Sequence, residues 1–435
     1  MPPYSSCSKT RPRPLQNLSE ESALESLGAP GILMSTHQNT RRVVITHALR
    51  TPIGRYLGAF KGLSAADLGA SVVGELVRRA GLQPADVGEV VMGNGRQAGG
   101  GPNVARQIAH RSGLGDSVPA WTMNMACGSG LKALECVAAA ISAGRYEVGI
   151  AGGTESMSGL PFFLPKMRTG YRLGHAKVVD SMYKDGFVCP IADMVMGETA
   201  EALAQELGIT RAEQDAFALS SQQKAGAAIA AGRFADEISP VEVPQRRGEA
   251  LTVSADEHPR PDTSLEKLSK LPPVFDAEKG TVSAANSSGI TDGAAGLVLM
   301  SEEEAQRRGL EVLAIVGESA QAGVDPCRMG IGPVPAVAAL EAKNEIALAD
   351  YDLVELNEAF AAQVLACCKE LEISDDRLNV NGGAIALGHP IGATGARIVV
   401  TLVHELARRG ASNGLATLCI SGGMGIATAF HRDQA

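Results

Sequence analysis

Short apolar runs alternate with amphipathic segments along most of this chain. The runs at 43–46, 90–94 and 148–156 predict buried strands. Residues 64–80 predict a helix, because apolar residues recur at helical spacing behind Ser64, and serine caps helices well. Strands that alternate with helices indicate an α/β fold, with a largely parallel sheet covered by helices on both faces.

Residues 156–288 interrupt this alternation of strands and helices. They contain proline-rich and charged loops and predicted helices near 197–207 and 211–231. The alternation then returns. It predicts the strands 296–300, 313–318, 353–357 and 414–420 and the helices 334–342, 358–371 and 394–409. We therefore expect an N-terminal α/β half at 41–155, completed by about 289–308, a loop domain at 156–288 and a C-terminal α/β half at 309–435.

Residues 1–40 are rich in Pro, Ser, Gln and Asn and hold few apolar positions. We expect a disordered leader here, because such a segment cannot bury enough apolar surface to fold. Glu20, Glu21 and Glu25 make the leader unlike a mitochondrial transit peptide, which is usually poor in acids.

The second α/β region repeats the first. Residues 85–94 resemble residues 349–357 after a shift of about 263 positions. His389 follows Cys127 by 262 positions, and both residues lie in glycine-rich turns that precede predicted helices. Two similar halves packed about a pseudo-twofold axis would bring the matching helix N-termini together.

Charge and cysteine usage exclude several classes of protein. The net charge of −9 argues against a general nucleic-acid binder, and no apolar run approaches the ~20 residues that a membrane-spanning helix needs. The eight cysteines are scattered, contain no CxxC pair and fit no compact set of zinc ligands. We expect reduced thiols, a cytoplasmic location and no metal site.

The stretch 124–130 reads Asn-Met-Ala-Cys-Gly-Ser-Gly and places Cys127 at a turn before a predicted helix at 131–141. Its glycines permit sharp backbone angles and the close approach of a ligand. The positive end of the helix favours a thiolate over a thiol. A lone cysteine is often simply a buried structural residue. The glycine turns around His389 and Cys419 favour a nucleophile instead.

A cysteine nucleophile needs a base or a cationic neighbour, and His389 is the candidate. Cys419 begins a second glycine turn, at 419–425. A second thiol beside the first would suit proton transfer, because a thiol can donate and accept a proton near neutrality. A buried strand cysteine is the alternative interpretation of Cys419.

Asn357 lies at the end of a predicted strand, where α/β proteins build active sites. Its amide can orient a water molecule or donate a hydrogen bond towards an oxyanion. Backbone N–H groups at Cys127 and around Ser421 can form a further oxyanion hole.

Six ordered motifs resemble those of the thiolase family, the acyl-CoA C-acyltransferases that cleave or form 3-ketoacyl-CoA. They extend over the chain from about residue 41 to its end and lie at 124–130, 152–156 (GGTES), 280–293 (GTVSAANSSGITDG), 357–361 (NEAFA), 381–395 (NGGAIALGHPIGATG) and 419–425. The resemblance implies a fold of two similar α/β halves in five αβαβα layers, with an inserted loop domain that covers CoA. It also implies an acyltransferase of fatty acid metabolism, such as beta-oxidation. CoA and acyl-CoA would be its substrates, with no permanently bound cofactor, and it would form a homotetramer, or a dimer at least.

The resemblance implies a role for each matching residue. Cys127 matches the acylated nucleophile, and His389 matches the residue that activates it. Cys419 matches the acid/base at the substrate carbon, and Asn357 matches the holder of an oxyanion-hole water. Contacts with the substrate or CoA are implied for Met196, Phe275, Ala284, Ser288, Phe360 and Ser421.

Two positions depart from the family pattern. Ser421 stands where the family often has glycine, which alters the pocket wall but keeps the backbone N–H. Val195 stands where biosynthetic acetoacetyl-CoA thiolases tend to carry histidine, so the acyl chain length is open. The alternatives are an acetoacetyl-CoA-specific acetyltransferase, a ketoacyl synthase of the same superfamily and a non-catalytic acyl-CoA binder. The second cysteine, Cys419, argues against the synthase.

One segment of the loop domain is basic in an otherwise acidic chain. Residues 161–184 have a net charge of +4, from Lys166, Arg168, Arg172, Lys177 and Lys184 against Asp180. Such a stretch is commonly a solvated or subunit-contact loop. The alternative is a surface that attracts the phosphates of CoA.

Overall fold

Strand β1 (Val43–Arg50) joins two sets of strands into one continuous mixed sheet, in the computed structural model that describes residues 41–344 and 346–433. The strand order is β14-β15-β16-β13-β1-β12-β5-β3-β4. The other strands in this order are β3 (Glu89–Gly93), β4 (Ala120–Met123), β5 (Val148–Ser156), β12 (Thr291–Ser301), β13 (Ala314–Gly323), β14 (Leu353–Leu356), β15 (Asn413–Ile420) and β16 (Met424–His431). The predicted leader lies outside the described residues.

The same pairing order occurs twice, which confirms the duplicated halves. In the first half β1 pairs with β12, β12 with β5, and β5 with β3. In the second half β13 pairs with β16, β16 with β15, and β15 with β14. The sheets of the two halves meet where Val44 and Ile45 of β1 face Ile315 and Ala314 of β13.

The expectation of a largely parallel sheet is wrong. Only three of the pairings in this sheet are parallel in the described part of the chain: β3 with β4, β3 with β5, and β14 with β15. The sequence did not predict strand β16. It follows β15 after a short turn at Gly422 and Gly423, which both have positive φ. A turn this short can only produce an antiparallel neighbour. Strand β12 likewise runs antiparallel to β5.

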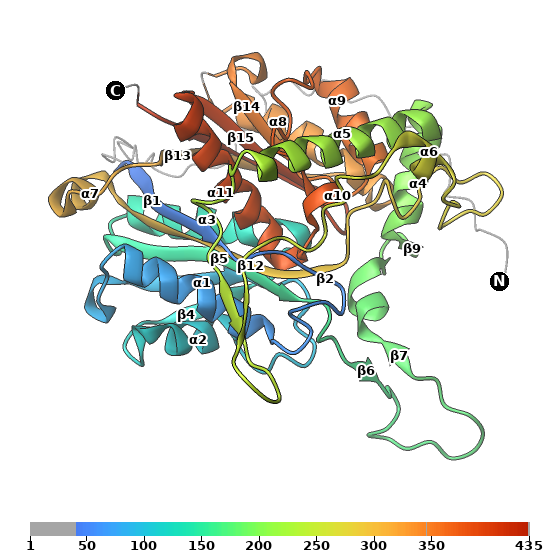
Figure 1. Ribbon diagram of the computed structural model, residues 1–435, viewed down its shortest axis with the longest axis horizontal. Helices are drawn as coiled ribbons and strands as arrows, with labels where there is room; N and C mark the ends of the chain where they lie inside the picture. Colours follow the sequence, from blue (N-terminus) through green and yellow to red (C-terminus); the bar gives the residue numbers. More distant parts are fainter. Residues whose placement is uncertain (1–40, 345, 434–435) are drawn as a thin grey trace, which may run out of the picture. The chain divides into compact units, whose positions relative to one another are not determined.

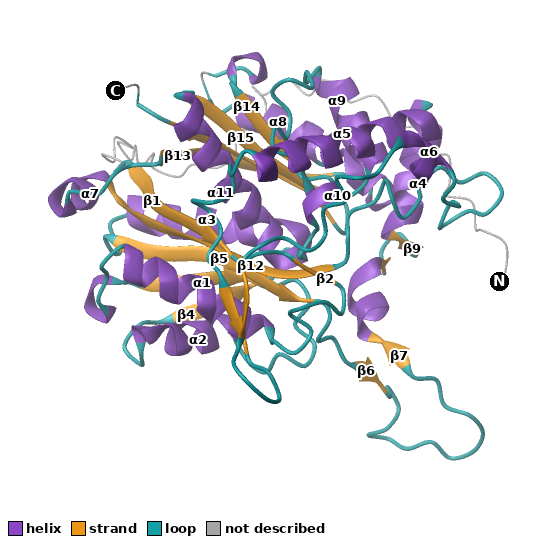
Figure 2. Ribbon diagram, in the orientation of Figure 1, coloured by secondary structure: helices purple, strands orange, loops and turns teal. Residues whose placement is uncertain are grey.

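Helices fill three layers around the two halves of the sheet (Figure 1, Figure 2). Helices α1 (Ala65–Arg79) and α2 (Val104–Ala109) share one apolar core with the outer face of the first half. Helices α8 (Pro333–Glu341) and α9 (Ala361–Leu371) do so for the second half. Between the halves, α3 (Ser129–Ser142) and α11 (Ile391–Arg409) form a third core with both. These are the five αβαβα layers expected.

Local sequence explains where the helices begin. Ser64 caps α1: its hydroxyl accepts from the N–H of Asp67, and the Asp67 carboxylate accepts from the N–H of Ser64. A carboxylate in the first turn and arginines in the last turn both interact favourably with the helix dipole and stabilise the helix. Helix α9 begins at Ala361, later than the predicted Glu358, because Phe360 is extended and residues 359–361 pair with residues 286–288.

Residues 157–290 carry three α-helices, a π-helix at Tyr183–Phe187 and several two-stranded pairs. The α-helices are α4 (Met196–Leu207), α5 (Arg211–Ala230) and α6 (Leu265–Ser269), and the pairs are β6 (Phe162–Phe163) with β7 (Val179–Asp180), β8 (Val188–Cys189) with β9 (Met194–Val195), and β10 (Val241–Val243) with β11 (Leu251–Val253). The segment between β6 and β7 extends away from the layers as a long loop (Figure 1). No helix among the described residues is long and apolar enough to cross a membrane.

Candidate active site

Cys127 lies on a tight turn between β4 and α3. Ala126, just before it, has a φ of 45°, an unfavourable value for a residue with a side chain. The turn is held by Ser129, whose hydroxyl donates to the Ala126 carbonyl and accepts from the Met125 N–H. Cys127 remains partly exposed while Gly128 and the start of α3 are buried. Strain beside a partly exposed thiol is typical of a functional site.

His389 faces Cys127 with its Nε2 atom, which lies 3.2 Å from the Cys127 Sγ atom. The Nδ1 atom lies 2.7 Å from the hydroxyl of Thr394, and that hydroxyl donates to the Pro390 carbonyl. Because the single hydroxyl hydrogen is used there, Nδ1 must be the protonated ring nitrogen. Nε2 therefore presents a lone pair to the thiol, as a general base requires.

Glycines bring the two halves of the site together. A Cβ atom on Gly130 would lie 2.6 Å from the Ala396 nitrogen, and one on Gly395 would lie 2.4 Å from the Leu131 nitrogen. Helices α3 and α11 therefore cross backbone to backbone at their first turns, which only glycine permits. Gly153 touches Gly392 in the same way, with a Cβ-to-carbonyl distance of 1.9 Å. This explains the glycines of three of the six motifs.

Cys419 is the penultimate residue of strand β15. It is fully buried, and the charge of Cys127 contributes to raising its pKa. Gly128 packs on Ile420, and the backbone N–H of Ser421 points at the Cys127 sulfur. Cys127 and His389 are therefore in contact, and the turn that follows Cys419 lies beside them.

Asn357 follows β14, the parallel neighbour of β15, so it lies one strand away from Cys419. Its side chain is 1% exposed, yet neither amide atom has a hydrogen-bond partner among the described residues. An unpartnered buried amide is costly and needs an explanation. A bound water or substrate oxygen would provide one.

Burial sets the protonation of these groups. Burial raises the pKa of Cys127, although the Arg96 charge and the Ser421 N–H lower it. Burial, helped by the charges of Arg96 and Arg397, lowers the pKa of His389 to about 3. Burial also raises the pKa of Cys419 well above its ordinary value. Desolvation therefore opposes the helix terminus and favours a thiol beside a neutral imidazole, so the resting thiolate expected from the sequence stays a prediction.

The sequence did not predict two residues of the site, Glu155 and Arg96. Glu155 of the GGTES motif accepts hydrogen bonds from the N–H groups of Gly95, Arg96 and Gly392, which joins a loop of the first half to the His389 turn. Arg96 is 8% exposed, and its Nε atom has no partner among the described residues. Glu155 could have been found from the sequence, because it belongs to one of the six motifs. Arg96 had no signal, because its approach to Cys127 is purely tertiary.

The residues expected to contact CoA form one connected group. Phe275 and Phe360 stack edge to face with their ring centroids 6.4 Å apart, and Gly197, next to Met196, packs on Phe275. The Ser288 N–H donates to the Ala359 carbonyl, and Ala284 is exposed four residues earlier. Gly289 then accepts from the His389 N–H, so the group adjoins the Cys127 site.

The described residues hold no group of three or more His, Cys, Asp or Glu that could bind a metal. In that part of the chain the thiols of six cysteines are free, namely Cys127, Cys136, Cys189, Cys367, Cys368 and Cys419. The side chains of Met157, Met182 and Ile391 form a small apolar cluster against Cys127, joined by Phe187.

Comparisons with known proteins agree with this geometry. The sequence model of the thiolase N-terminal domain matches residues 43–303, and that of the thiolase C-terminal domain matches residues 310–432. The chain therefore belongs to the thiolase family.

Relatives and solved structures support the same assignment. An acetyl-CoA acetyltransferase of Pseudomonas aeruginosa is 53% identical over 391 residues, which cover 90% of this chain and 99% of the relative. A probable acetyl-CoA acetyltransferase of Escherichia coli is 52% identical over 392 residues, with the same coverage. The human mitochondrial 3-ketoacyl-CoA thiolase superposes with a TM-score of 0.87 at 41% identity, covering 91% of this chain and 100% of that structure. The predicted fold class and the prediction of a thiolase-type acyltransferase are confirmed.

Proposed function

We propose that this protein catalyses the reversible, CoA-dependent cleavage of 3-oxoacyl-CoA to acetyl-CoA and a shortened acyl-CoA, or the reverse condensation. The acyl group is carried on Cys127. The observation that supports this most is the 3.2 Å contact between His389 Nε2 and Cys127 Sγ beside a second buried thiol, Cys419. One thiol is the nucleophile, and the other handles the proton at carbon.

In the cleavage direction, His389 Nε2 takes the Cys127 proton and the sulfur attacks the 3-oxo carbon. The bond between C2 and C3 breaks, and its electron pair takes a proton from the Cys419 thiol, releasing acetyl-CoA. The raised pKa of Cys419 suits this donor role, because it keeps the thiol protonated. A CoA thiol then passes its proton to Cys419 and attacks the Cys127 thioester. Cys127 leaves and recovers its proton from His389, so every group returns to its starting state.

Developing negative charge on oxygen needs donors. The N–H groups of Cys127 and Ser421 both act on the Cys127 sulfur and suit the thioester oxygen of the acyl-enzyme. The unpartnered amide of Asn357 suits a second site, through a water molecule. No step requires a resident cofactor, since CoA and acyl-CoA are the substrates.

The side chains around Cys127 favour a short acyl group. Met157, Met182 and Phe187 crowd the thiol, and Val195 lies at the nearby start of α4. Acetoacetyl-CoA is therefore the first substrate to test, and an acetoacetyl-CoA-specific acetyltransferase is the second candidate function.

We extend the proposal to the setting of the enzyme. The loop between β6 and β7 presents apolar side chains that a single chain leaves uncovered, with Leu173 99% exposed and Met167 66% exposed. Packing of this loop against other copies would bury them, which favours a homotetramer. Residues 156–288 would form the domain that covers CoA, between halves at 41–155 and 309–435. Free cysteines support a cytoplasmic location.

The purified protein should convert acetoacetyl-CoA and CoA into two molecules of acetyl-CoA, followed by loss of absorbance of the 3-oxo thioester. Mass spectrometry should find an acetyl group on Cys127 when CoA is withheld. A decarboxylating ketoacyl synthase would need a malonyl thioester, and a non-catalytic binder would bind CoA without turnover. Either result would refute the proposal. Longer 3-oxoacyl-CoA substrates in the same assay measure the chain-length limit.

A further inference from the structure

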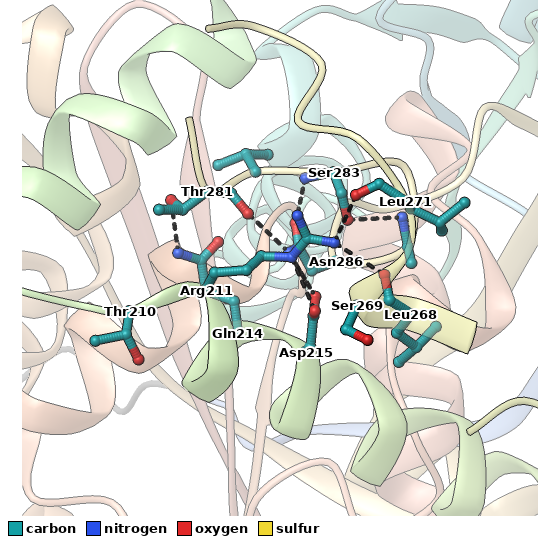
Figure 3. Close-up of polar contacts among 12 residues, drawn as sticks. Thr210, Arg211, Gln214, Asp215, Leu268, Ser269, Leu271, Thr281, Ser283 and Asn286 are labelled. Carbon is teal, nitrogen blue, oxygen red and sulfur yellow. Dashed lines mark hydrogen bonds and ion pairs between the residues drawn. The ribbon is translucent and has the colours of Figure 1, made fainter. Parts of the chain in front are cut away.

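A buried carboxylate, Asp215, joins three chain segments on the side of the loop domain that adjoins Phe360. It projects from the first turns of α5 and is 3% exposed. Arg211, one turn earlier, donates from Nε to both Asp215 oxygens at 2.9 and 2.8 Å. Asn286 donates to the same carboxylate at 3.0 Å. Figure 3 shows Arg211 and Asn286 meeting at Asp215.

Arg211 extends the contact to a second segment. Its Nη2 atom donates to the carbonyls of Leu268 and Leu271, both at 2.9 Å, at the end of α6. The Leu268 carbonyl also accepts from the Leu271 N–H, so the guanidinium adds to the pairing at the end of the helix. The guanidinium, which Asp215 holds in place, therefore caps the C-terminal end of α6.

Asn286 extends the hydrogen-bond network of Asp215 to the third segment, 281–288. Its Oδ1 atom accepts from the Ser283 N–H at 2.7 Å, and its Nδ2 atom also donates to the Thr281 carbonyl at 3.1 Å. Gln214, beside Asp215, donates to the Thr281 hydroxyl at 2.9 Å. The turn that contains Ala284 is thus held on its inner side by an amide that itself depends on Asp215.

The far end of this segment is anchored on the catalytic half. The Ala361 N–H donates to the Asn286 carbonyl, and the Ser288 N–H donates to the Ala359 carbonyl. The Val274 N–H donates to the Val282 carbonyl, which ties Phe275 to the same segment. Movement at Asn286 would therefore displace Ala284, Ser288 and Phe275 together.

We propose that Asp215 is a positioning residue for CoA: it holds Arg211 and Asn286 so that segment 281–288 keeps the position in which Ala284 and Ser288 contact the pantetheine arm. This inference rests on the proposed function. Asp215 touches no reacting atom, so its loss weakens CoA binding and leaves the Cys127–His389 pair intact.

The test compares Asp215→Asn with the control variant Glu75→Gln. Glu75 lies on α1, and its carboxylate accepts hydrogen bonds from Arg78 and Arg79. Removing a charged hydrogen-bond partner should raise the KM for CoA about tenfold in Asp215→Asn and change kcat by less than about threefold. Glu75→Gln should match the wild type. The rate of Cys127 alkylation by iodoacetamide should be equal in all three proteins.

Arg211→Gln is the second variant, because Arg211 is 24% exposed in its side chain and tolerates polar replacement. It should raise the KM for CoA in the same direction, and the double variant should add little, since both changes break one network. This variant decides the matter if Asp215→Asn does not fold. An unchanged KM overturns the proposal, as does a parallel fall of kcat and alkylation rate. Wild-type protein that fails to bind CoA by calorimetry would instead refute the proposed function.

Discussion

The Nε2 atom of His389 lies 3.2 Å from the Sγ atom of Cys127, although the two residues are 262 positions apart in the chain. Each residue sits at the start of a central helix, and the two helices touch through glycine backbone. The duplication of the α/β half thus places the proposed nucleophile and the proposed base at equivalent positions, one from each copy.

Cys127→Ser should lose covalent acylation and reduce turnover by roughly 10⁴-fold. A serine hydroxyl is far harder to ionise than a thiol, and a neutral imidazole with its pKa lowered to about 3 is a weak base for it. Intact-mass measurement after incubation with acetoacetyl-CoA checks this. Iodoacetamide should modify Cys127 before the other thiols, and equal labelling of several cysteines would speak against an activated nucleophile.

Cys419→Ala should still accept an acyl group on Cys127 but turn over about 10²–10⁴-fold more slowly, because no group handles the proton at carbon. The side chain is fully buried, so Cys419→Ser is the matched variant that retains a weakly acidic hydrogen. Separate measurement of the acylation burst and of steady turnover distinguishes the two steps. Wild-type turnover in Cys419→Ala would remove Cys419 from the mechanism.

Arg96→Leu should slow alkylation of Cys127 by roughly threefold to tenfold. The Arg96 charge is the largest influence that lowers the pKa of Cys127, so its removal raises that pKa further and reduces the thiolate fraction. Arg96→Lys keeps the charge and should stay near the wild-type rate. If the leucine and lysine variants react alike, the charge of Arg96 has no influence on the nucleophile.

Acylation of Cys127 should be nearly independent of pH from about pH 5 to 8. His389, with its pKa lowered to about 3, stays neutral over this range, and Cys127, with its pKa raised, stays a thiol. The proton count of the pair is therefore constant. The rate should fall only below about pH 4, as His389 takes a proton, and rise above about pH 9, as the thiolate forms. Stopped-flow acylation across this range is the measurement, and a limb near the ordinary histidine pKa would contradict it.

Reversing Lys166, Arg168 and Arg172 to Glu should raise the KM for CoA and reduce the size of the oligomer in sedimentation. All three lie on the exposed loop between β6 and β7, where positive potential attracts phosphate and salt weakens the attraction. Lys61→Glu, an exposed charge reversal in the first half, is the control. Unchanged KM and unchanged size would show that the loop is only a solvated surface.

Element positions followed closely from apolar periodicity and capping residues. Helix α1 begins after Ser64, as predicted, because its cap uses only neighbouring residues. Strand direction did not follow: β16 was missed, and the pairing of β12 with β5 depends on where a chain of more than a hundred residues returns to the sheet. Periodicity records which side of an element is buried, and it contains no information about the neighbouring strand.

The sequence by itself determined the two similar α/β halves, the glycine turns and the residue types of the site, because each of these depends on contacts within a short stretch of chain. Only the tertiary structure sets the directions in which the pKa values of Cys127, His389 and Cys419 shift, since burial is the sum of surroundings contributed by both halves. It also decided that Arg96 acts on Cys127 and that Asp215 joins segments more than fifty residues away, because the atoms involved meet only when the layers are packed.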